Sequence, residues 1–227
     1  MGAAHIFIVA LLIIRGESKM KIGLVPMAAK PYHAGHHALV EAAASENDRV
    51  IVYVSTSDRK RKGEFPIMGQ DMVRVWKEEI EKVLPGNVEP QYGGSPVRKV
   101  YEELERADAA NSQDTYRVYS DPTDTSRNYP EAYRQKNFPG IYNAGQVIFA
   151  AEENPAAMTR GEGTPNISGT KMRSSLEACD FSAFAENLPD GVNTENVYKI
   201  LCGKDPHEGK PDPTNEAILR AFIRNAL

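Results

Sequence analysis

The feature that most constrains the fold is a near-continuous apolar run within residues 49–55, which read RVIVYVS. A strand with one solvent-exposed face alternates apolar and polar residues, whereas this run is apolar on both faces. It therefore predicts a parallel strand that helices cover on both sides. Further strands are expected at residues 21–26, 88–92, 115–120 and 145–151.

Segments with helical spacing of apolar residues separate these strands. The sequence predicts helices over residues 35–45, from Pro66 to residue 83, from Pro96 onward and over residues 170–178. Strands that alternate with helices form βαβ units and a mostly parallel sheet. The expected fold class is α/β, a Rossmann-like open parallel sheet with helices on both faces and a small C-terminal helical tail.

The chain of 227 residues is expected to have three parts. Residues 1–19 form an N-terminal extension, residues 20–180 the Rossmann-like domain, and residues 181–227 a helical segment packed on it. Helical stretches are expected there at 194–201 and 215–225.

The extension contains an apolar stretch, residues 3–14, that is short for a membrane span. No Lys or Arg precedes it and no small-residue cleavage site follows, so a signal peptide fits poorly. We expect the folded domain to begin at Met20, with residues 1–19 as an added extension or a weak anchor.

Charge and cysteine content limit the classes of partner. The net charge is −4, and nucleic-acid binding normally needs a basic face, so no nucleic-acid partner is expected. Cys179 and Cys202 have no second Cys or His at metal-ligand spacing, so no protein-held metal site is predicted. We expect a cytoplasmic protein without a membrane partner, and homo-oligomer formation is left open.

The first candidate motif is KPYHAGH, from Lys30 to His36, directly after the first expected strand. A helix N-terminus at the carboxyl end of a strand offers free N–H groups and a favourable dipole to a phosphate. Gly35 permits close backbone approach, while His33 and His36 can donate to the same phosphate oxygens. The alternative is that both histidines are ordinary surface or capping residues.

The second candidate motif is ISGTKMR, residues 167–173. Ser168 and Thr170 can cap a helix, and Lys171 and Arg173 then fall near its start. Cations at a helix N-terminus oppose the dipole, which makes sense if they face a bound anion. Alone this pattern is common, but together with the first motif it is more specific.

The pair resembles the two signatures of the HIGH-type nucleotidyltransferase superfamily. Residues 30–36 resemble its HxGH signature, and residues 167–173 resemble its second signature, SGTxxR. The resemblance spans about residues 20–180 and implies direct transfer of a nucleotidyl group with release of pyrophosphate.

By this resemblance, the catalytic residues are His33, His36, Lys30 and Arg173. The histidines would contact the α- and β-phosphates, and the second motif would hold the β- and γ-phosphates. The remaining residues expected to bind the nucleotide are Gly35, Met27, Ala28, Ser168, Thr170 and Lys171. The implied ligands are ATP and a magnesium ion held mostly by phosphate and water, with no metal ligand assigned to the protein.

The resemblance also indicates which nucleotide and which acceptor to expect. Arg173 resembles adenylyltransferases, and residues 30–36 look most like archaeal-type nicotinamide mononucleotide adenylyltransferases. Residues 26–29 depart from that family, which usually has a Gly-Arg-Phe-Gln type of segment there. A phosphate-bearing small molecule, first nicotinamide mononucleotide, is therefore the expected acceptor. A cytidylyltransferase acting on a polyol or choline-type phosphate is the alternative.

Three other segments have two interpretations each. Residues 121–141 read as a long loop, either a substrate lid built on Arg127, Tyr129, Tyr133 and Arg134 or a disordered segment. Trp76 is expected in the core rather than stacked on an acceptor ring. Residues 59–62, RKRK, are expected to be solvated surface rather than a phosphate clamp.

Two rival functions belong to other classes. An ATP-dependent ligase would use the same scaffold to make an acyl-adenylate. A nucleotide-sensing protein would bind the nucleotide without turning it over, and it would not need both His33 and His36.

Overall fold

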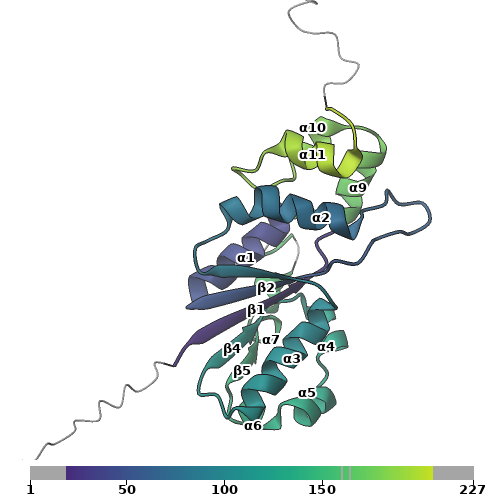
Figure 1. The fold of residues 1–227 in the computed structure, drawn as a ribbon. Helices are drawn as coiled ribbons and strands as arrows, with labels where there is room; N and C mark the ends of the chain where they lie inside the picture. The colour runs from purple at the N-terminus through teal and green to yellow at the C-terminus, as the bar shows by residue number, and fades with distance from the viewer. Residues whose placement is uncertain (1–18, 160, 164, 207–227) are drawn as a thin grey trace, which may run out of the picture.

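A five-stranded parallel sheet forms the centre of the chain (Figure 1). The computed structural model describes residues 19–159, 161–163 and 165–206, so the expected helix at 215–225 and residues 1–18 of the extension lie outside the described residues. The strand order is β3-β2-β1-β4-β5. The strands are β1 (Lys21–Met27), β2 (Arg49–Val54), β3 (Val88–Tyr92), β4 (Thr115–Val118) and β5 (Val147–Phe149). The predicted Rossmann-like α/β class is confirmed.

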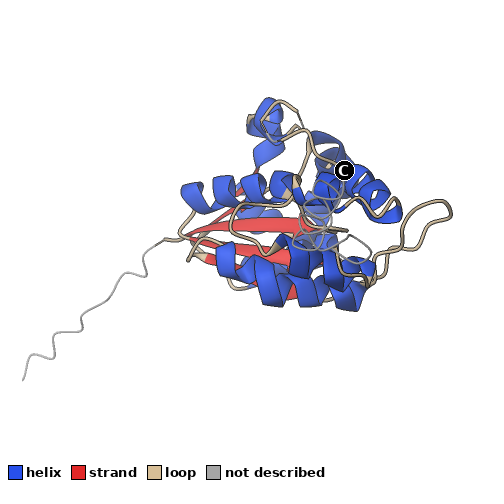
Figure 2. Cartoon of the chain, turned by 90° about the horizontal axis from the view of Figure 1, so that it is seen from above, coloured by secondary structure: helices blue, strands red, loops and turns tan. Residues whose placement is uncertain are grey.

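Helices cover both faces of this sheet, as Figures 1 and 2 show. Side chains of a strand point alternately to its two faces. In β1, Val25 and Met27 enter one core cluster, whereas Ile22 and Leu24 enter the other. Helix α1 (Ala34–Glu46) supplies side chains to the first cluster and α3 (Pro96–Ala109) to the second. The apolar run in β2 is buried in the same alternating way, which explains why both of its faces are apolar.

The sheet has a switch point between β1 and β4. The chain runs outward from β1 through β2 to β3, then returns to the other side of β1 and continues through β4 to β5. Crossovers on either side of the switch point diverge, which leaves a crevice at the carboxyl ends of these two strands.

The helix after β2 starts later than the sequence predicts. Residues Arg59 and Ile67 pair as an isolated antiparallel bridge, so helix α2 (Gly69–Val75) begins only at Gly69. It continues through a π-helical turn, η1 (Trp76–Ile80), and a 3-10 turn, η2 (Glu81–Val83). Trp76 is fully buried with its ring centroid 4.7 Å from that of Tyr32, so its expected place in the core is confirmed.

The C-terminal helices pack on the α1 and α2 side of the sheet. They are α9 (Gly169–Glu177), α10 (Phe181–Ala185) and α11 (Thr194–Cys202). Their buried side chains Met172, Phe184 and Val197 belong to the same core cluster as Trp76. Among the described helices, none has the length and apolar character needed to cross a bilayer.

The prediction of a long loop at residues 121–141 is wrong, and so is the disordered interpretation of it. The lid interpretation is wrong for Tyr129 and Arg134, which are both buried. The segment folds as three short helices: α4 (Pro122–Asn128), α5 (Glu131–Asn137) and α6 (Pro139–Asn143). Tyr129 is fully buried, and buried Arg134 forms an ion pair with Glu152. The prolines that indicated a loop stand instead at helix starts, where the missing N–H costs nothing.

The strand expected at residues 145–151 is also shorter than predicted. The chain turns into helix α7 (Ala150–Glu153) directly after β5, and helix α8 (Pro155–Met158) follows. Buried Ala150 and Ala151 extended the apolar run in the sequence, although both belong to the helix.

Candidate functional site

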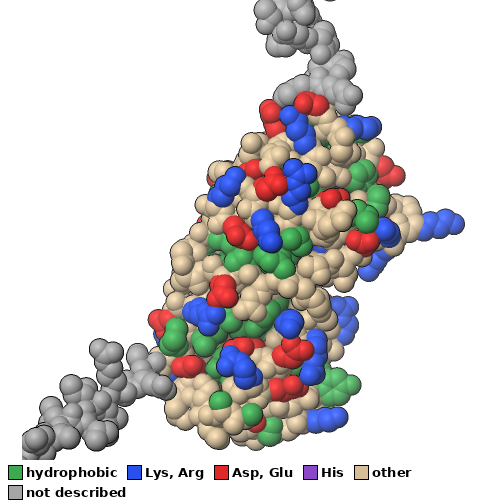
Figure 3. Space-filling view, viewed as in Figure 1, with side chains coloured by type: hydrophobic (Ala, Val, Ile, Leu, Met, Phe, Trp, Pro, Cys, Tyr) green, Lys and Arg blue, Asp and Glu red, His purple; other side chains and the backbone are tan. Residues whose placement is uncertain are grey.

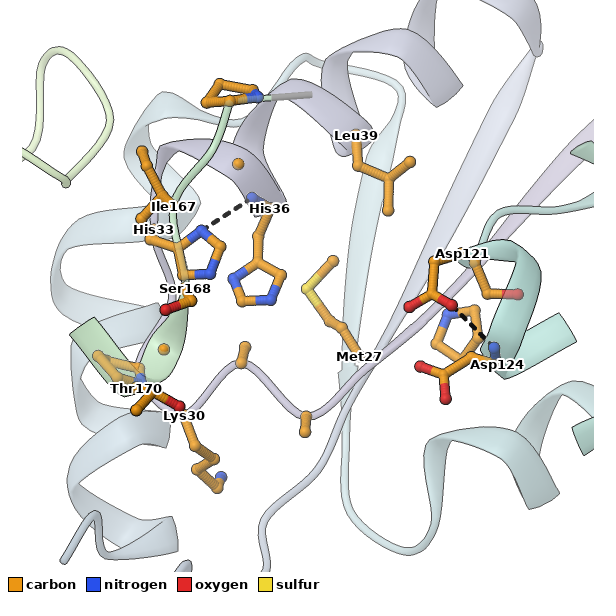
Figure 4. Close-up of a pocket in the computed structure, with 18 of the residues that line it drawn as sticks. Met27, Lys30, His33, His36, Leu39, Asp121, Asp124, Ile167, Ser168 and Thr170 are labelled. Atoms are coloured by element: carbon orange, nitrogen blue, oxygen red, sulfur yellow. Dashed lines mark hydrogen bonds between the residues drawn. The ribbon is translucent and has the colours of Figure 1, made fainter. Parts of the chain in front are cut away.

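A cavity of about 360 Å³ opens at the carboxyl ends of β1 and β4, at the switch point of the sheet. Residues from both sequence motifs line it together with the end of β1 (Figure 4). The expected site residues among them are Met27, Ala28, Lys30, His33, Gly35, His36, Ser168, Thr170 and Arg173. Segments about 130 residues apart in the sequence therefore share one cavity.

The loop between β1 and α1 approaches the cavity in an unusual backbone conformation. Ala29 is buried with φ at 48°, in the left-handed region that an L-residue enters at a cost of about 1–2 kcal/mol. The peptide bond between Lys30 and Pro31 is cis. A backbone conformation such as that of Ala29 often occurs at ligand sites, where the surrounding structure holds it.

His33 is the N-cap of α1, and this position determines the orientation and the tautomer of its imidazole ring. Its Nδ1 accepts the backbone N–H of His36 at 3.3 Å. A neutral imidazole whose Nδ1 accepts carries its proton on Nε2, so this network assigns Nε2 as a donor. A helix cap therefore fixes both the orientation and the tautomer of His33.

His36 lies against His33 with the ring centroids 3.8 Å apart (Figure 4). The Tyr32 ring also stacks with that of His36, and their centroids are 5.6 Å apart. Gly35 gives the His33 ring room, because a Cβ there would lie 3.1 Å from it and the ring would have to shift by a few tenths of an ångström. The two imidazoles consequently form one wall of the cavity.

Lys30 is buried, and its side chain extends away from the imidazole rings in Figure 4. Its Nζ donates to the backbone oxygen of Ser55 at 2.6 Å. Burial lowers the pKa of Lys30 to about 8, and the negative charge of Asp58 opposes that shift. Lys30 is thus a cation of the cavity wall whose charge changes near physiological pH.

The second motif forms the start of α9. Ser168 caps the helix by accepting the backbone N–H of Lys171 at 3.1 Å. Buried Arg173 donates through Nη1 to the backbone oxygen of Lys30 at 2.7 Å and through Nη2 to Thr170 Oγ1 at 2.9 Å. Arg173 therefore joins the two motifs directly.

Lys171 is the one expected site residue that the structure leaves outside. Its side chain is exposed, and it is absent from the cavity lining. One residue position along α9 turns a side chain by about 100°, so Lys171 and Arg173 cannot both face the cavity in the same way.

Sequence reasoning missed two carboxylates of the lining, Asp121 and Asp124. Asp121 follows β4 and caps α4 by accepting the backbone N–H of Asp124 at 2.8 Å. Burial and the nearby charge of Asp121 raise the pKa of Asp124. The Asp-Pro pair directly after a strand was the available signal, because it marks a helix start at the carboxyl edge of the sheet.

Arg59 is also a lining residue, so the expectation of a solvated surface is wrong for it. Lys60, Arg61 and Lys62 are exposed, and the expectation is confirmed for those three. Within a run of four basic residues, the sequence contains no signal for which one turns inward.

The cavity carries opposite charges on opposite sides. Lys30 and Arg173 belong to the two motifs, and Arg59 is joined to Arg173 through Glu64. Asp121 and Asp124 lie across the cavity from His33 and His36 (Figure 4). Phosphates fit the first side, where cations and helix N–H groups gather. Hydroxyl or amine donors fit the second. Among the described residues, no group of three or more His, Cys, Asp or Glu is placed to hold a metal ion.

Comparison with known proteins finds one family resemblance. A protein-family model described as the citrate lyase ligase C-terminal domain matches residues 22–85, and no curated protein matches the chain. The matched segment runs from β1 to the end of the α2 helical run and contains Lys30, His33 and His36. This match points to an enzyme and supports the broad adenylyltransferase-like class.

Proposed function

We propose that the chain transfers AMP from ATP to a phosphate-bearing small molecule and releases pyrophosphate. One observation carries the proposal: the starts of α1 and α9, each with its signature residues, open onto a single cavity at the switch point of a parallel sheet. Nicotinamide mononucleotide is the first acceptor to test, because the resemblance of residues 30–36 favours it.

The resemblance of the two motifs implies direct transfer without a covalent enzyme intermediate. A phosphate oxygen of the acceptor attacks the α-phosphorus of ATP, and the bond from that phosphorus to the bridging oxygen of pyrophosphate breaks. His33, oriented by its cap, and His36 stabilise the charge that develops on the transferred group. Lys30 and Arg173 contribute positive charge on the same side of the cavity.

Magnesium is proposed as the counterion of the triphosphate, and the donor set supports that choice. Asp121 and Asp124 are the cavity carboxylates that can contribute ligands, and phosphate oxygens and water would complete the shell. When bound, the ion neutralises phosphate charge. The same two carboxylates can accept hydroxyl groups of a ribose, so they suit a nucleotide-like acceptor.

A pyrophosphate-release screen tests the proposal. ATP and CTP are each offered with nicotinamide mononucleotide, FMN, phosphopantetheine and polyol phosphates, and products are identified by mass spectrometry. We expect release with ATP and a dinucleotide-type product that retains the AMP–phosphate linkage. Tight ATP binding without pyrophosphate release for every acceptor would instead favour a nucleotide sensor.

A ligase is the second candidate, and the matched family description favours it. In that case, a carboxylate attacks the α-phosphorus and the product is an acyl-adenylate with pyrophosphate. Adding short carboxylic acids to the screen, with hydroxylamine to trap an activated acyl group, separates the two. Hydroxamate formation would assign ligation rather than transfer to a phosphate.

A further inference from the structure

A basic hairpin projects between β2 and α2, at the right of Figure 1. Arg59 and Ile67 exchange backbone hydrogen bonds of 2.8 and 3.0 Å, and the backbone N–H of Glu64 donates to Arg61 at 3.1 Å to close the tip. Lys and Arg side chains stand out on this projection in Figure 3. The hairpin thus carries a cluster of cations beside the cavity, of which Arg59 reaches the lining.

Glu64 bridges two arginines at this edge. Its Oε2 accepts Arg59 Nε at 2.9 Å and its Oε1 accepts Arg59 Nη2 at 3.1 Å, a two-pronged contact. Its Oε2 also lies 3.0 Å from Nε of Arg173, the buried arginine of the second motif. One carboxylate therefore holds a cation from the hairpin and a cation from α9 together.

The fit of Glu64 to Arg173 is incomplete. Among the described residues, the buried Nε of Arg173 has no hydrogen-bond partner of acceptable geometry, although Glu64 is at ion-pair distance. A buried donor without an aligned acceptor is costly, and the cost falls when a better-placed anion arrives. A phosphate presents three oxygens in place of two and can satisfy Arg59 and Arg173 together.

The position of Glu64 allows it to leave. Its side chain is partly exposed at a surface hairpin, and it follows Gly63, whose φ of 78° marks the turn at the tip. Withdrawal of this tip requires no change in the sheet. Arg173, by contrast, is fixed by Lys30 and Thr170 and stays in place.

We propose that Arg59 and Arg173 form a phosphate subsite, and that Glu64 occupies it as a displaceable plug until a phosphoryl group of the substrate replaces it. The proposal rests on the proposed function, since it takes a phosphate of the nucleotide or of the acceptor as the natural occupant. It also makes Arg59 a binding residue that neither signature motif contains.

Isothermal titration of the full chain tests the plug with two probes, tripolyphosphate for the nucleotide and ribose 5-phosphate for the acceptor. The apparent affinity of a probe is reduced by the fraction of molecules whose subsite is not occupied by Glu64. Removing the Glu64 carboxylate makes the subsite open in all molecules, so Glu64→Gln should bind one or both probes about three- to tenfold more tightly. Arg59→Met should lose about tenfold or more for the same probe. The probe that responds identifies the source of the phosphate.

Matched controls carry the same charge changes away from the cavity. Glu89→Gln removes a carboxylate of edge strand β3 that pairs with Arg49, and Arg98→Met removes an exposed cation of α3 that pairs with Glu105. Both should leave probe affinity within about twofold at constant ionic strength. In the double variant Glu64→Gln with Arg59→Met, the gain should vanish, because the plug and the donor act on one subsite.

Unchanged or weaker binding of both probes by a folded Glu64→Gln protein overturns the proposal, because Glu64 would then only brace the arginines. Glu64→Ala repeats the test, and thermal melting checks folding. If neither variant folds, unchanged probe affinity in Arg59→Met overturns the subsite. Tighter probe binding without pyrophosphate release for any acceptor would remove the proposed function and leave the plug intact.

Discussion

At the scale of single residues, the imidazole of His36 has the most direct proposed role. It stacks with both His33 and Tyr32 and lines the cavity. We expect His36→Ala to lower kcat by about 100-fold or more, as loss of a transition-state donor does. Steady-state kinetics on the acceptor that the screen identifies measures this, with circular dichroism as a check on folding. A folded variant with full activity would exclude the role.

Lys30 predicts a pH dependence of nucleotide binding. Its pKa of about 8 means that the free protein loses this cation as pH rises from 7 to 9. A bound triphosphate favours the protonated form, so ATP affinity should fall as pH rises above about 8. In Lys30→Met, ATP affinity should be lower below about pH 8, should lack this step, and should approach that of the unmodified protein at higher pH. Titration calorimetry at several pH values compares the two proteins, and an equal step in both would assign it to another group.

The lowered pKa of Lys30 also determines how the stability of the fold changes with pH. The folded-state pKa of Lys30 lies below its ordinary value of 10.5, so the unfolded chain binds the extra proton between about pH 8 and 10.5. Stability therefore gains from this group as pH rises through that window. The burial that lowers the pKa of Lys30 therefore reduces the stability of the folded protein at neutral pH.

At the scale of elements, the junction between the hairpin and α2 depends on Gly69. A Cβ at this position would lie 1.8 Å from the backbone oxygen of Thr56, which cannot move as a side-chain end can. We expect Gly69→Ala to destabilise the fold by about 1–3 kcal/mol or more, through forced backbone movement. Urea unfolding measures the change.

Gly86 provides the matched control for this substitution. A Cβ there would meet nothing within 4 Å, and its φ is not in the left-handed region. Gly86→Ala should be neutral or stabilising by up to about 1 kcal/mol, because Ala restricts the unfolded chain. Equal stability of both variants would show that α2 can shift to accommodate the methyl group.

The elements that the sequence predicts well are those set by local periodicity. The five strands were expected near their observed positions. Strands β1, β2 and β5 are short apolar runs, whereas β3, with the sequence VEPQY, and β4, with TYRV, are weaker patterns. Residues 121–141 were misread because prolines mark both loops and helix starts, and only packing decides between them. Tyr129 and Arg134 become buried through contacts with β5 and α7, which are distant in sequence.

At the scale of the whole molecule, the two motifs could be predicted to share a cavity because a parallel sheet gathers the carboxyl ends of its strands. The remaining lining could not, since Arg59, Asp121 and Asp124 reach the cavity through tertiary packing and caps. Their residue types are ordinary in loops and helix starts, so no local pattern separates them from surface residues. The charge division of the cavity is accordingly a property of the fold rather than of any motif.

The C-terminal helices should unfold together with the sheet. Val197 and Tyr198 of α11 share a core cluster with Val25 of β1. Buried Glu79 ties α11 to η1, because it accepts Asn196 Nδ2 at 2.6 Å and the backbone N–H of Asn193 at 3.4 Å. We therefore expect amide hydrogen exchange in α11 and β1 to report the same opening free energy under native conditions.

Glu79→Ala tests whether the hydrogen bonds of Glu79 make α11 unfold together with the sheet. The variant leaves the backbone amide of Asn193 without its acceptor and leaves Asn196 Nδ2 with only the longer contact to Glu78 Oε2, 3.2 Å, at a cost of about 1–3 kcal/mol. Exchange in α11 should then accelerate more than exchange in β1, whereas Glu89→Gln on the edge strand should change neither. If α11 already exchanges much faster than β1 in the unmodified chain, the helix is an independent unit. Its apolar contacts with the core would then contribute less than their burial indicates.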